Sequence, residues 1–327
     1  NGHVGSIVVV DADSGEIFGL VNSPAYDPNA LISDKKGDAA AIFSSKNSPL
    51  LNRAIKGLFP PGSVFKIPVA VAGLDTNKTT QYSTFMCPGF YELGGIKFRC
   101  AHIHNSQNLL EAIAHSCNVY FYYLGAMLGP DVINHYARIL GLGELTHVDL
   151  PFEEAGHISS QRFRANSSAR SWFKGDTLNL SIGQGDTMLP PIQLVRMMVI
   201  VANEGVDVPL HIIKQIGDKP VDNYNFRREV PIDKSLFRII NKGLRATVTD
   251  YSGTAHVLDF SNFYVAGKTG TAQTSANKDH HAWFVGHAKG EHKNIVFCVF
   301  IEHGGSSQNA CLIARDLIVA MRVDNLL

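Results

Sequence analysis

The sequence predicts a mixed α/β fold of the α+β type, in which an antiparallel sheet flanked by helices stands beside an all-helical lobe. Strand-like patterns occur at both ends of the 327-residue chain, and helix-like patterns fill its middle. The composition agrees, because a chain with 45% hydrophobic and 18% charged residues can bury a sizeable core.

The two ends of the chain are expected to form the sheet. Residues 6–11 and 16–21 have the pattern of a β-hairpin, with Asp13-Ser14-Gly15 at its turn. Three more strands are expected near the other end, over 264–272, 282–288 and 294–302. A single antiparallel sheet would therefore draw strands from both termini, with the helical part inserted between them.

The middle of the chain is expected to be helical. A first helix should begin at about Ser63, and Pro68 should kink it or tighten its first turns, because proline has no backbone N–H to donate. Further helices are expected over 109–116, 119–128, 131–140, 191–203, 234–247 and 309–322.

These patterns describe one domain, residues 1–327, with a sheet subdomain (about 1–60 and 225–327) and a helical lobe (about 61–224). The formal net charge is zero and the pI is about 7.4, so nothing indicates a nucleic-acid partner. No stretch approaches the length of apolar sequence that crosses a membrane, and no signal peptide begins at Asn1.

Three short segments indicate nucleophilic catalysis: Ser63-Val64-Phe65-Lys66, Ser116-Cys117-Asn118 and Lys268-Thr269-Gly270. A serine hydroxyl is a poor nucleophile until a neighbouring base removes its proton. A lysine three residues later on a helix lies one turn away and can be that base if its amine is neutral. Partial burial and a second cation, Lys268, would lower the pKa of Lys66.

In this order and context the segments resemble the penicillin-binding proteins, serine acyl-transferases that cross-link peptidoglycan. The resemblance extends over nearly the whole chain, and a stretch at 172–177 is similar to the monofunctional (class B), elongation-type penicillin-binding protein 2 group. The other segments that carry it are Asn52-Arg53-Ala54, Phe59-Pro60-Pro61-Gly62-Ser63, Ile182-Gly183-Gln184-Gly185, Thr187, Pro190-Pro191-Ile192-Gln193 and His281-Ala282-Trp283-Phe284-Val285-Gly286.

The resemblance implies the fold of the penicilloyl-serine transferases, with the active site in the cleft between sheet and helical lobe. It also implies the catalytic roles. Ser63 would attack the carbonyl of the penultimate D-Ala of a stem peptide, and Lys66 would take the Ser63 proton. Ser116 would pass a proton to the leaving amine, and Asn118 would hold Lys66 and a substrate amide. Backbone N–H groups of Ser63 and Thr271 would form the oxyanion hole.

The third segment is implied to bind the substrate. Lys268 and the hydroxyls of Thr269 and Thr271 would hold the terminal carboxylate. Gly270 lies between them, and the small residues of this strand are expected to let a substrate backbone lie alongside it. Catalysis would need no cofactor.

The resemblance also implies a setting for the whole protein. An N-terminal membrane anchor and a non-catalytic domain, both outside this sequence, would hold the catalytic domain on the periplasmic side of a bacterial inner membrane. The expected partners are stem peptides ending in D-Ala-D-Ala, β-lactam antibiotics, a membrane glycan polymerase and rod-shape scaffold proteins. This chain would then be an excised catalytic domain that serves cell-wall elongation.

The cysteines give a second signal. Cys87, Cys100, His104 and Cys117 could form a closed tetrahedral Zn²⁺ site with a structural role, because three thiolates and an imidazole suit that metal. Two alternatives remain open: a Cys87–Cys100 disulfide, and His102 in place of His104. The remaining two cysteines, Cys298 and Cys311, are expected to be buried small apolar residues.

Other functions on the same fold also remain open. A serine β-lactamase needs a base for its deacylating water, commonly a Glu four residues before an Asn, but Gly175 stands four before Asn179. A non-catalytic β-lactam sensor would keep the same motifs. A carboxypeptidase differs only in using water as the acceptor in place of an amine. A zinc hydrolase is excluded because no ligand set leaves an open position.

Overall fold

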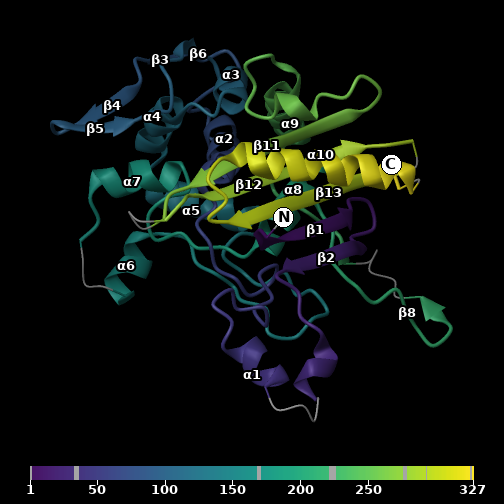
Figure 1. Cartoon of the computed structure of the whole chain (residues 1–327). Helices are drawn as coiled ribbons and strands as arrows, with labels where there is room; N and C mark the ends of the chain where they lie inside the picture. The colour runs from purple at the N-terminus through teal and green to yellow at the C-terminus, as the bar shows by residue number, and fades with distance from the viewer. Residues whose placement is uncertain are drawn as a thin grey trace.

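The computed structural model describes residues 2–32, 37–167, 171–220, 226–274, 278–291, 293–324 and 326–327. Its centre is a five-stranded antiparallel sheet in the order β11-β12-β13-β1-β2 (Figure 1). The strands are β1 (Val4–Asp11), β2 (Ile17–Ser23), β11 (Tyr264–Ala272), β12 (His281–Lys289) and β13 (Asn294–Glu302). Both ends of the chain therefore contribute to one sheet, and the predicted α+β fold is confirmed.

Helices cover both faces of this sheet, which explains why its middle strand is apolar along its length. β13 is buried from Ile295 to Ile301, as expected of a strand with no solvent face. Helix α10 (Ser307–Val323) crosses one face (Figure 1), and α8 (Pro191–Ala202) packs against the other. Helix α9 (Lys234–Thr249) runs beside β11.

The helical part sits at the β11 end of the sheet. It comprises the 3₁₀ turn η2 (Gly62–Phe65) and the helices α2 (Lys66–Asp75), α3 (Leu109–Ala114), α4 (Asn118–Leu128), α5 (Pro130–Ile139) and α7 (Lys174–Ser181). Among the described residues, no helix is both long and apolar enough to cross a bilayer. The division at about residues 60 and 225 stays a prediction, and α8, which falls between them, lies against the sheet.

Several short elements were not expected from the sequence. Four short strands lie between α2 and α3, and they pair as β3 with β6 and β4 with β5. They are β3 (Phe85–Cys87), β4 (Phe90–Leu93), β5 (Ile96–Arg99) and β6 (Asn105–Gln107). The remaining elements are η1 (Pro28–Leu31), α1 (Asp38–Phe43), α6 (Gln161–Ser167), β7 (Val206–Asp207), β8 (Gln215–Ile216), β9 (Lys219–Pro220), β10 (Arg228–Glu229) and η4 (His256–Leu258).

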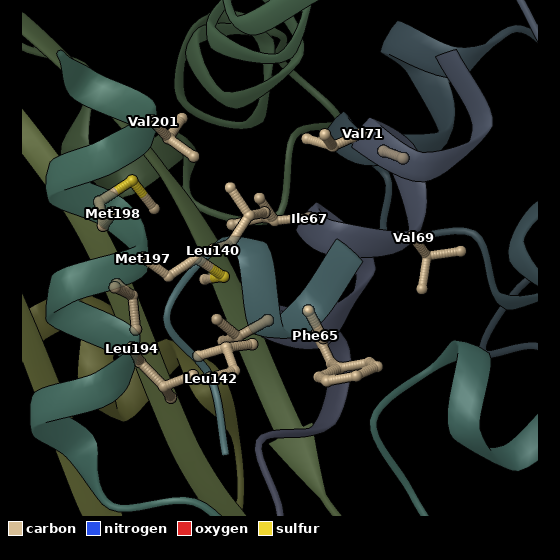
Figure 2. Packing of buried hydrophobic residues seen from close by; sticks show 14 of the residues in the cluster. Phe65, Ile67, Val69, Val71, Leu140, Leu142, Leu194, Met197, Met198 and Val201 are labelled. Carbon is tan, nitrogen blue, oxygen red and sulfur yellow. The ribbon is translucent and has the colours of Figure 1, made fainter. Parts of the chain in front are cut away.

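Helix α2 lies at the centre of the molecule. It is buried from Lys66 to Leu74, so its sequence is apolar all round and has no polar stripe. Figure 2 shows Ile67 of this helix facing Met197 of α8, with Leu140 between them. Pro68 is the third residue of α2, where a missing N–H breaks no helical hydrogen bond, and the tightened turn is the preceding η2.

Candidate active site

The three sequence segments meet at one cavity of about 590 Å³ between the helical part and the edge strand β11. Ser63 comes from η2, Ser116 and Asn118 from the α3–α4 junction, and Thr269 and Thr271 from β11. Three segments that are distant in the sequence therefore bring hydroxyl and amide groups to a single cleft.

The turn that carries Ser63 is fixed from both sides. The Gly62 N–H donates to the Gly183 carbonyl at 3.0 Å, and the Trp283 indole N–H donates to the Pro60 carbonyl at 3.1 Å. Gly62 has φ +53°, and a Cβ there would lie 2.7 Å from the Thr271 carbonyl oxygen, so only glycine fits. Lys66 follows directly after this turn as the first residue of α2, three positions after Ser63.

The Lys66 amine is buried among the groups of the second segment. It donates to the Ser116 carbonyl and to Asn118 Oδ1, both at 2.7 Å, and to Ser116 Oγ at 3.1 Å. Burial lowers the pKa of Lys66 to about 8, although the nearby thiols of Cys100 and Cys117 act in the opposite direction. The amine is therefore partly neutral near physiological pH, as a base requires.

Ser116 is held in a strained backbone conformation. Its φ is +55°, a left-handed value that costs a non-glycine residue about 1–3 kcal/mol. His115, the residue before it, is fixed by the Gln107 Oε1 at 2.6 Å and the Ser252 hydroxyl at 2.9 Å. Cys117, the residue after it, is fully buried. The conformation of the second segment is thus set by its two neighbours.

Only part of the third segment lines the cavity. Lys268 is fully buried and does not line the cavity, whereas Thr269 and Thr271 do. Its amine donates to the Thr269 carbonyl at 3.3 Å, and burial together with the Lys66 charge holds the pKa of Lys268 well below its usual value. Lys268 is therefore buried outside the lining of the cavity.

Gly270 makes room for the turn that carries Ser63. A Cβ at this position would lie 2.9 Å from Val64 Cγ2 and 3.0 Å from the Pro61 carbonyl oxygen. The expectation that the small residues of this strand let a substrate backbone lie alongside it stays a prediction. Gly270 lets the nucleophile's turn pack directly on β11.

Thr254 is a site residue that the sequence reasoning missed. Its hydroxyl lies 2.7 Å from the Thr269 hydroxyl, and its N–H donates to the Ala114 carbonyl at 3.2 Å. Its own carbonyl accepts from the Gln308 side chain at 2.8 Å. Thr254 lines the cavity and links the second and third segments. It lies in a loop outside every motif, so no spacing signal pointed to it.

Some residues that carry the family resemblance have structural roles. Arg53 is buried and pairs with Glu302 of β13 at 2.9 Å. The buried Gln193 amide accepts from Gly143 N–H at 2.8 Å and donates to two backbone carbonyls, each at 2.7 Å. These side chains hold segments around the site and do not line the cavity.

The four predicted metal ligands lie together. The Cys87, Cys100 and Cys117 sulfurs and a His104 ring nitrogen all lie within 4.8 Å of one another. His104 Nδ1 is 3.6 Å from Cys87 Sγ and 3.5 Å from Cys100 Sγ. All five cysteines of the chain are free thiols in the structure.

His102 takes a different position from His104. Its carbonyl accepts a hydrogen bond from the Cys87 thiol at 3.6 Å, while the ring stays outside the group of four. Cys298 and Cys311 are fully buried, and burial raises the pKa of each thiol. Both therefore pack as small apolar residues.

The Cys/His cluster contacts the catalytic segment directly. The Asn118 N–H donates to Cys100 Sγ at 3.2 Å, and Cys117 lies between Ser116 and Asn118 in the chain. A hydrogen bond between the Cys100 and Cys117 thiols lowers the pKa of Cys100 and raises the pKa of Cys117. The loop that carries Ser116 and Asn118 therefore belongs both to the Cys/His cluster and to the cleft.

A buried Ser-x-x-Lys turn that faces a Lys-Thr-Gly edge strand, on a sheet drawn from both termini, defines the class of penicillin-interacting active-site-serine proteins. Residues 5–319 match the family described as "Penicillin binding protein transpeptidase domain". The chain belongs to this family, and the resemblance inferred from the sequence is confirmed.

Individual curated proteins indicate which members of the family the chain is similar to. The chain is 32% identical to the peptidoglycan D,D-transpeptidase MrdA of Acinetobacter baumannii over 96% of this chain and 50% of that protein. It is 27% identical to MrdA of Escherichia coli over 96% of this chain and 53% of that protein. The chain thus spans about half the length of the curated relatives it matches.

The chain is also similar to solved structures of the penicillin-binding protein 2 group. The chain superimposes on Pseudomonas aeruginosa PBP2, solved in complex with WCK 5153, with a TM-score of 0.88 at 32% identity, covering 97% of this chain and 70% of that one. Helicobacter pylori PBP2, solved in complex with MreC, gives a TM-score of 0.90 at 29% identity, covering 99% and 61%. The predicted similarity to the penicillin-binding protein 2 group is confirmed.

Proposed function

We propose that the chain is the catalytic domain of an elongation-type peptidoglycan D,D-transpeptidase that forms an acyl-enzyme on Ser63. The observation that carries the proposal is the Lys66 amine, buried at hydrogen-bond distance from Ser116 and Asn118, directly after the turn that carries Ser63. A lowered pKa on a buried lysine beside a cleft serine is the arrangement that activates a nucleophile.

The reaction follows from these positions. Ser63 Oγ attacks the carbonyl of the penultimate D-Ala while Lys66 takes its proton, forming a tetrahedral intermediate. The C–N bond then breaks, and the proton passes through Ser116 Oγ to the leaving amine of the terminal D-Ala. An amine of a second stem peptide attacks the resulting ester and gives up a proton to Lys66. The C–O bond to Ser63 then breaks, the new amide forms, and Lys66 returns that proton to Ser63 Oγ.

Charge on the substrate is balanced by β11 and η2. Backbone N–H groups of Ser63 and Thr271 would stabilise the oxyanion. The hydroxyls of Thr269 and Thr271 line the cavity and would hold the terminal carboxylate directly. Lys268 would favour that carboxylate through its charge.

The test of Ser63 is covalent labelling. Ser63→Ala should abolish labelling by a fluorescent penicillin and leave the melting temperature unchanged, because the hydroxyl faces the cleft. Ser44→Ala, an exposed serine at the end of α1, is the matched control and should label normally. Labelling that persists in Ser63→Ala would refute the assignment.

The residues around the cavity favour a transpeptidase over a β-lactamase. Among its lining residues in the described part of the chain, none is Asp or Glu, so no carboxylate is in place to activate a deacylating water. Gly175, four residues before Asn179, supplies no carboxylate either. A side chain at this position would be crowded, because its Cβ would lie 3.0 Å from Phe98 Cζ. A penicillin adduct that lasts hours is expected, and one that turns over in seconds would indicate a β-lactamase.

Turnover of peptides separates the remaining alternatives. A transpeptidase should convert a D-Ala-D-Ala donor and a peptide amine into a cross-linked product. Release of D-Ala with no amide product would instead indicate a carboxypeptidase. A sensor would be acylated by penicillin but would release no D-Ala from any peptide.

We also propose that Cys87, Cys100, His104 and Cys117 bind a structural Zn²⁺. A tetrahedral zinc with thiolate and imidazole ligands requires ligand-to-ligand distances of about 3.5–3.8 Å. The two sulfur–nitrogen distances to His104 are 3.6 and 3.5 Å, and the Asn118 N–H on Cys100 is a typical outer hydrogen bond. The set is closed, so the ion would hold the Ser116 loop and take no part in the acyl transfer.

The zinc proposal is tested on protein purified without chelator. About one zinc per chain is expected, and Cys117→Ser should lose it, lower the melting temperature and slow penicillin acylation. Cys298→Ser, a buried thiol outside the cluster, is the control for destabilisation alone and should retain the metal. Protein with no metal and with Cys87 and Cys100 oxidised would overturn the proposal.

For the whole protein we propose a membrane anchor that places this domain in the periplasm, with a glycan polymerase and rod-shape scaffold proteins as partners. The support is by similarity: Helicobacter pylori PBP2 was solved with MreC, and another relative belongs to a "peptidoglycan synthase complex". The full-length protein should fractionate with membranes and co-purify with a polymerase, and failure of both would contradict the proposal.

A further inference from the structure

The catalytic cavity continues past strand β5 into a second cavity of about 380 Å³. The two cavities share five lining residues: Lys97, Arg99, Cys100, Ala101 and His102. The strand end and the loop that follows it therefore form a wall with a hollow on either side, and a peptide longer than the reacting group would contact this wall.

This wall is fixed relative to the catalytic groups. The side-chain amide of Asn118 donates to the Arg99 carbonyl at 3.2 Å, and the Tyr122 hydroxyl donates to the same carbonyl at 3.4 Å. The oxygen of the same amide, Asn118 Oδ1, accepts a hydrogen bond from Lys66 Nζ at 2.7 Å. One asparagine thus sets the distance between the buried base and β5.

The strand presents two cations to solvent. Side chains alternate along a strand, so Lys97 and Arg99 lie on the opposite face from Phe98, whose ring packs edge-on against Tyr122 at 5.8 Å. Lys97 and Arg99 are exposed, and the Lys97 amine lies over the Phe90 ring at 4.4 Å. Within the described residues, no carboxylate forms an ion pair with either of them.

The cavity walls carry exposed cations but no carboxylate side chain. The ionisable residues that line the two cavities are Lys97, Arg99, Cys100, His102, His115, Tyr122 and His280, and the lining contains no Asp or Glu within the described chain. Glu92 lies opposite Lys97 on the paired strand β4 but lines neither cavity. Asp250 meets this set only through His115, at 3.6 Å. A cleft of one sign attracts a ligand of the opposite sign.

We propose that Lys97 and Arg99 form a subsite for a carboxylate of the peptide substrate, separate from the terminal carboxylate at Thr269 and Thr271. The inference rests on the proposed transpeptidase function and adds a second recognition point to it. An arginine can bind a carboxylate through two parallel hydrogen bonds, so Arg99 should contribute more than Lys97. The carboxylate belongs either to the donor peptide or to the acceptor peptide.

The test measures binding to Ser63→Ala protein, which removes any dependence on acyl transfer. The donor arm uses two fluorescent D-Ala-D-Ala peptides that differ only in a carboxylate or a carboxamide on the preceding side chain. The acceptor arm uses two peptide amines that differ in the same way. In one arm the carboxylate form should bind about tenfold more tightly, and Arg99→Ala should reduce the preference to about twofold or less.

Three further variants test whether the preference for the carboxylate depends on the charge at position 99. Arg99→Gln keeps a long polar side chain on β5 and should lose the preference as Arg99→Ala does. Lys219→Ala removes an exposed lysine on the distant β9 and should keep it. Arg99→Lys should retain part of it.

Equal binding of both peptides in both arms, or a preference that survives Arg99→Ala and Arg99→Gln, would overturn the subsite. Failure of the proposed function would be seen separately, as penicillin labelling that does not require Ser63.

Discussion

At the scale of single residues, the site depends on two groups held in costly states. Lys66 is a buried amine with a lowered pKa, and Ser116 is a non-glycine residue with a left-handed backbone. Each is stabilised by the other, because Lys66 donates both to the Ser116 carbonyl and to its hydroxyl. The base and the proton relay therefore form a single unit, and neither geometry would persist alone.

This unit predicts the pH dependence of acylation. Lys66 accepts a proton only when neutral, so the second-order rate constant for penicillin acylation should rise with pH through the Lys66 pKa of about 8 and then level off. Stopped-flow labelling between about pH 6.5 and 9.5 would measure the profile. A flat profile over that range would contradict Lys66 as the base.

The same amine has a consequence for stability with a defined sign. The folded-state pKa lies below the unfolded value, so the unfolded chain binds more protons between about pH 8 and 10.4. The Lys66 contribution to the free energy of unfolding should therefore increase with pH across that window.

Residue types alone were enough to find the motif residues. Ser63 and Lys66 came from helical spacing, and Ser116 and Asn118 from the order of the three segments and the family that they resemble. Thr254 could not be found this way. Its role depends on a 2.7 Å contact with Thr269, fifteen residues further along the chain, which only the packing of a loop on β11 creates.

At the scale of elements, the long and strongly patterned segments were predicted well. Strands β11 and β13 have the predicted bounds, and the helices differ from prediction by a few residues at their ends. The short strands β3 to β6 were missed, because runs of only three or four residues are too short to show a clear alternation. Yet β5 carries the two cations of the proposed subsite, so the sequence could not suggest it.

The loop between α9 and β11 should align the two walls of the cleft. Thr254→Val keeps the shape of the side chain but removes the hydroxyl bonded to Thr269. The expected result is a penicillin acylation rate about tenfold lower, with a loss of stability of about 1 kcal/mol. Thr254→Ser should restore most of the rate because it keeps the hydroxyl.

The outcome for Thr254 separates alignment from folding. Acylation kinetics and urea unfolding of the same preparations would supply both quantities. If Thr254→Val and Thr254→Ser were equally slow, the hydroxyl would have no role in alignment. Thr249→Val, on the exposed end of α9, gives the background effect of the same exchange.

At the scale of the whole molecule, the sheet joins the two ends of the chain. β1 pairs with β13 on one side and β2 on the other, so strands from the two ends of this sequence lie side by side. The predicted antiparallel sheet from both termini followed from the distribution of strand patterns. The order of the strands did not, because sequence patterns do not specify which strands pair.

This closure predicts cooperative unfolding. Val8 is fully buried between Leu20 and Cys298, and Val8→Ala should reduce the free energy of unfolding by about 2 kcal/mol. Val21→Ala, on the neighbouring β2 at 56% exposure, should change it by less than about 0.5 kcal/mol. Urea unfolding followed by circular dichroism and by tryptophan fluorescence should give coincident transitions, and separate transitions would contradict closure by the sheet.

The packing of Gly270 against Val64 and Pro61 has a mechanical consequence. Because the Ser63 turn rests on β11 without an intervening side chain, the nucleophile and the Thr269–Thr271 segment move as a single rigid body. Substrates of different size must then be accommodated by the side chains that line the cavity, because Asn118 also ties β5 to the Lys66 amine.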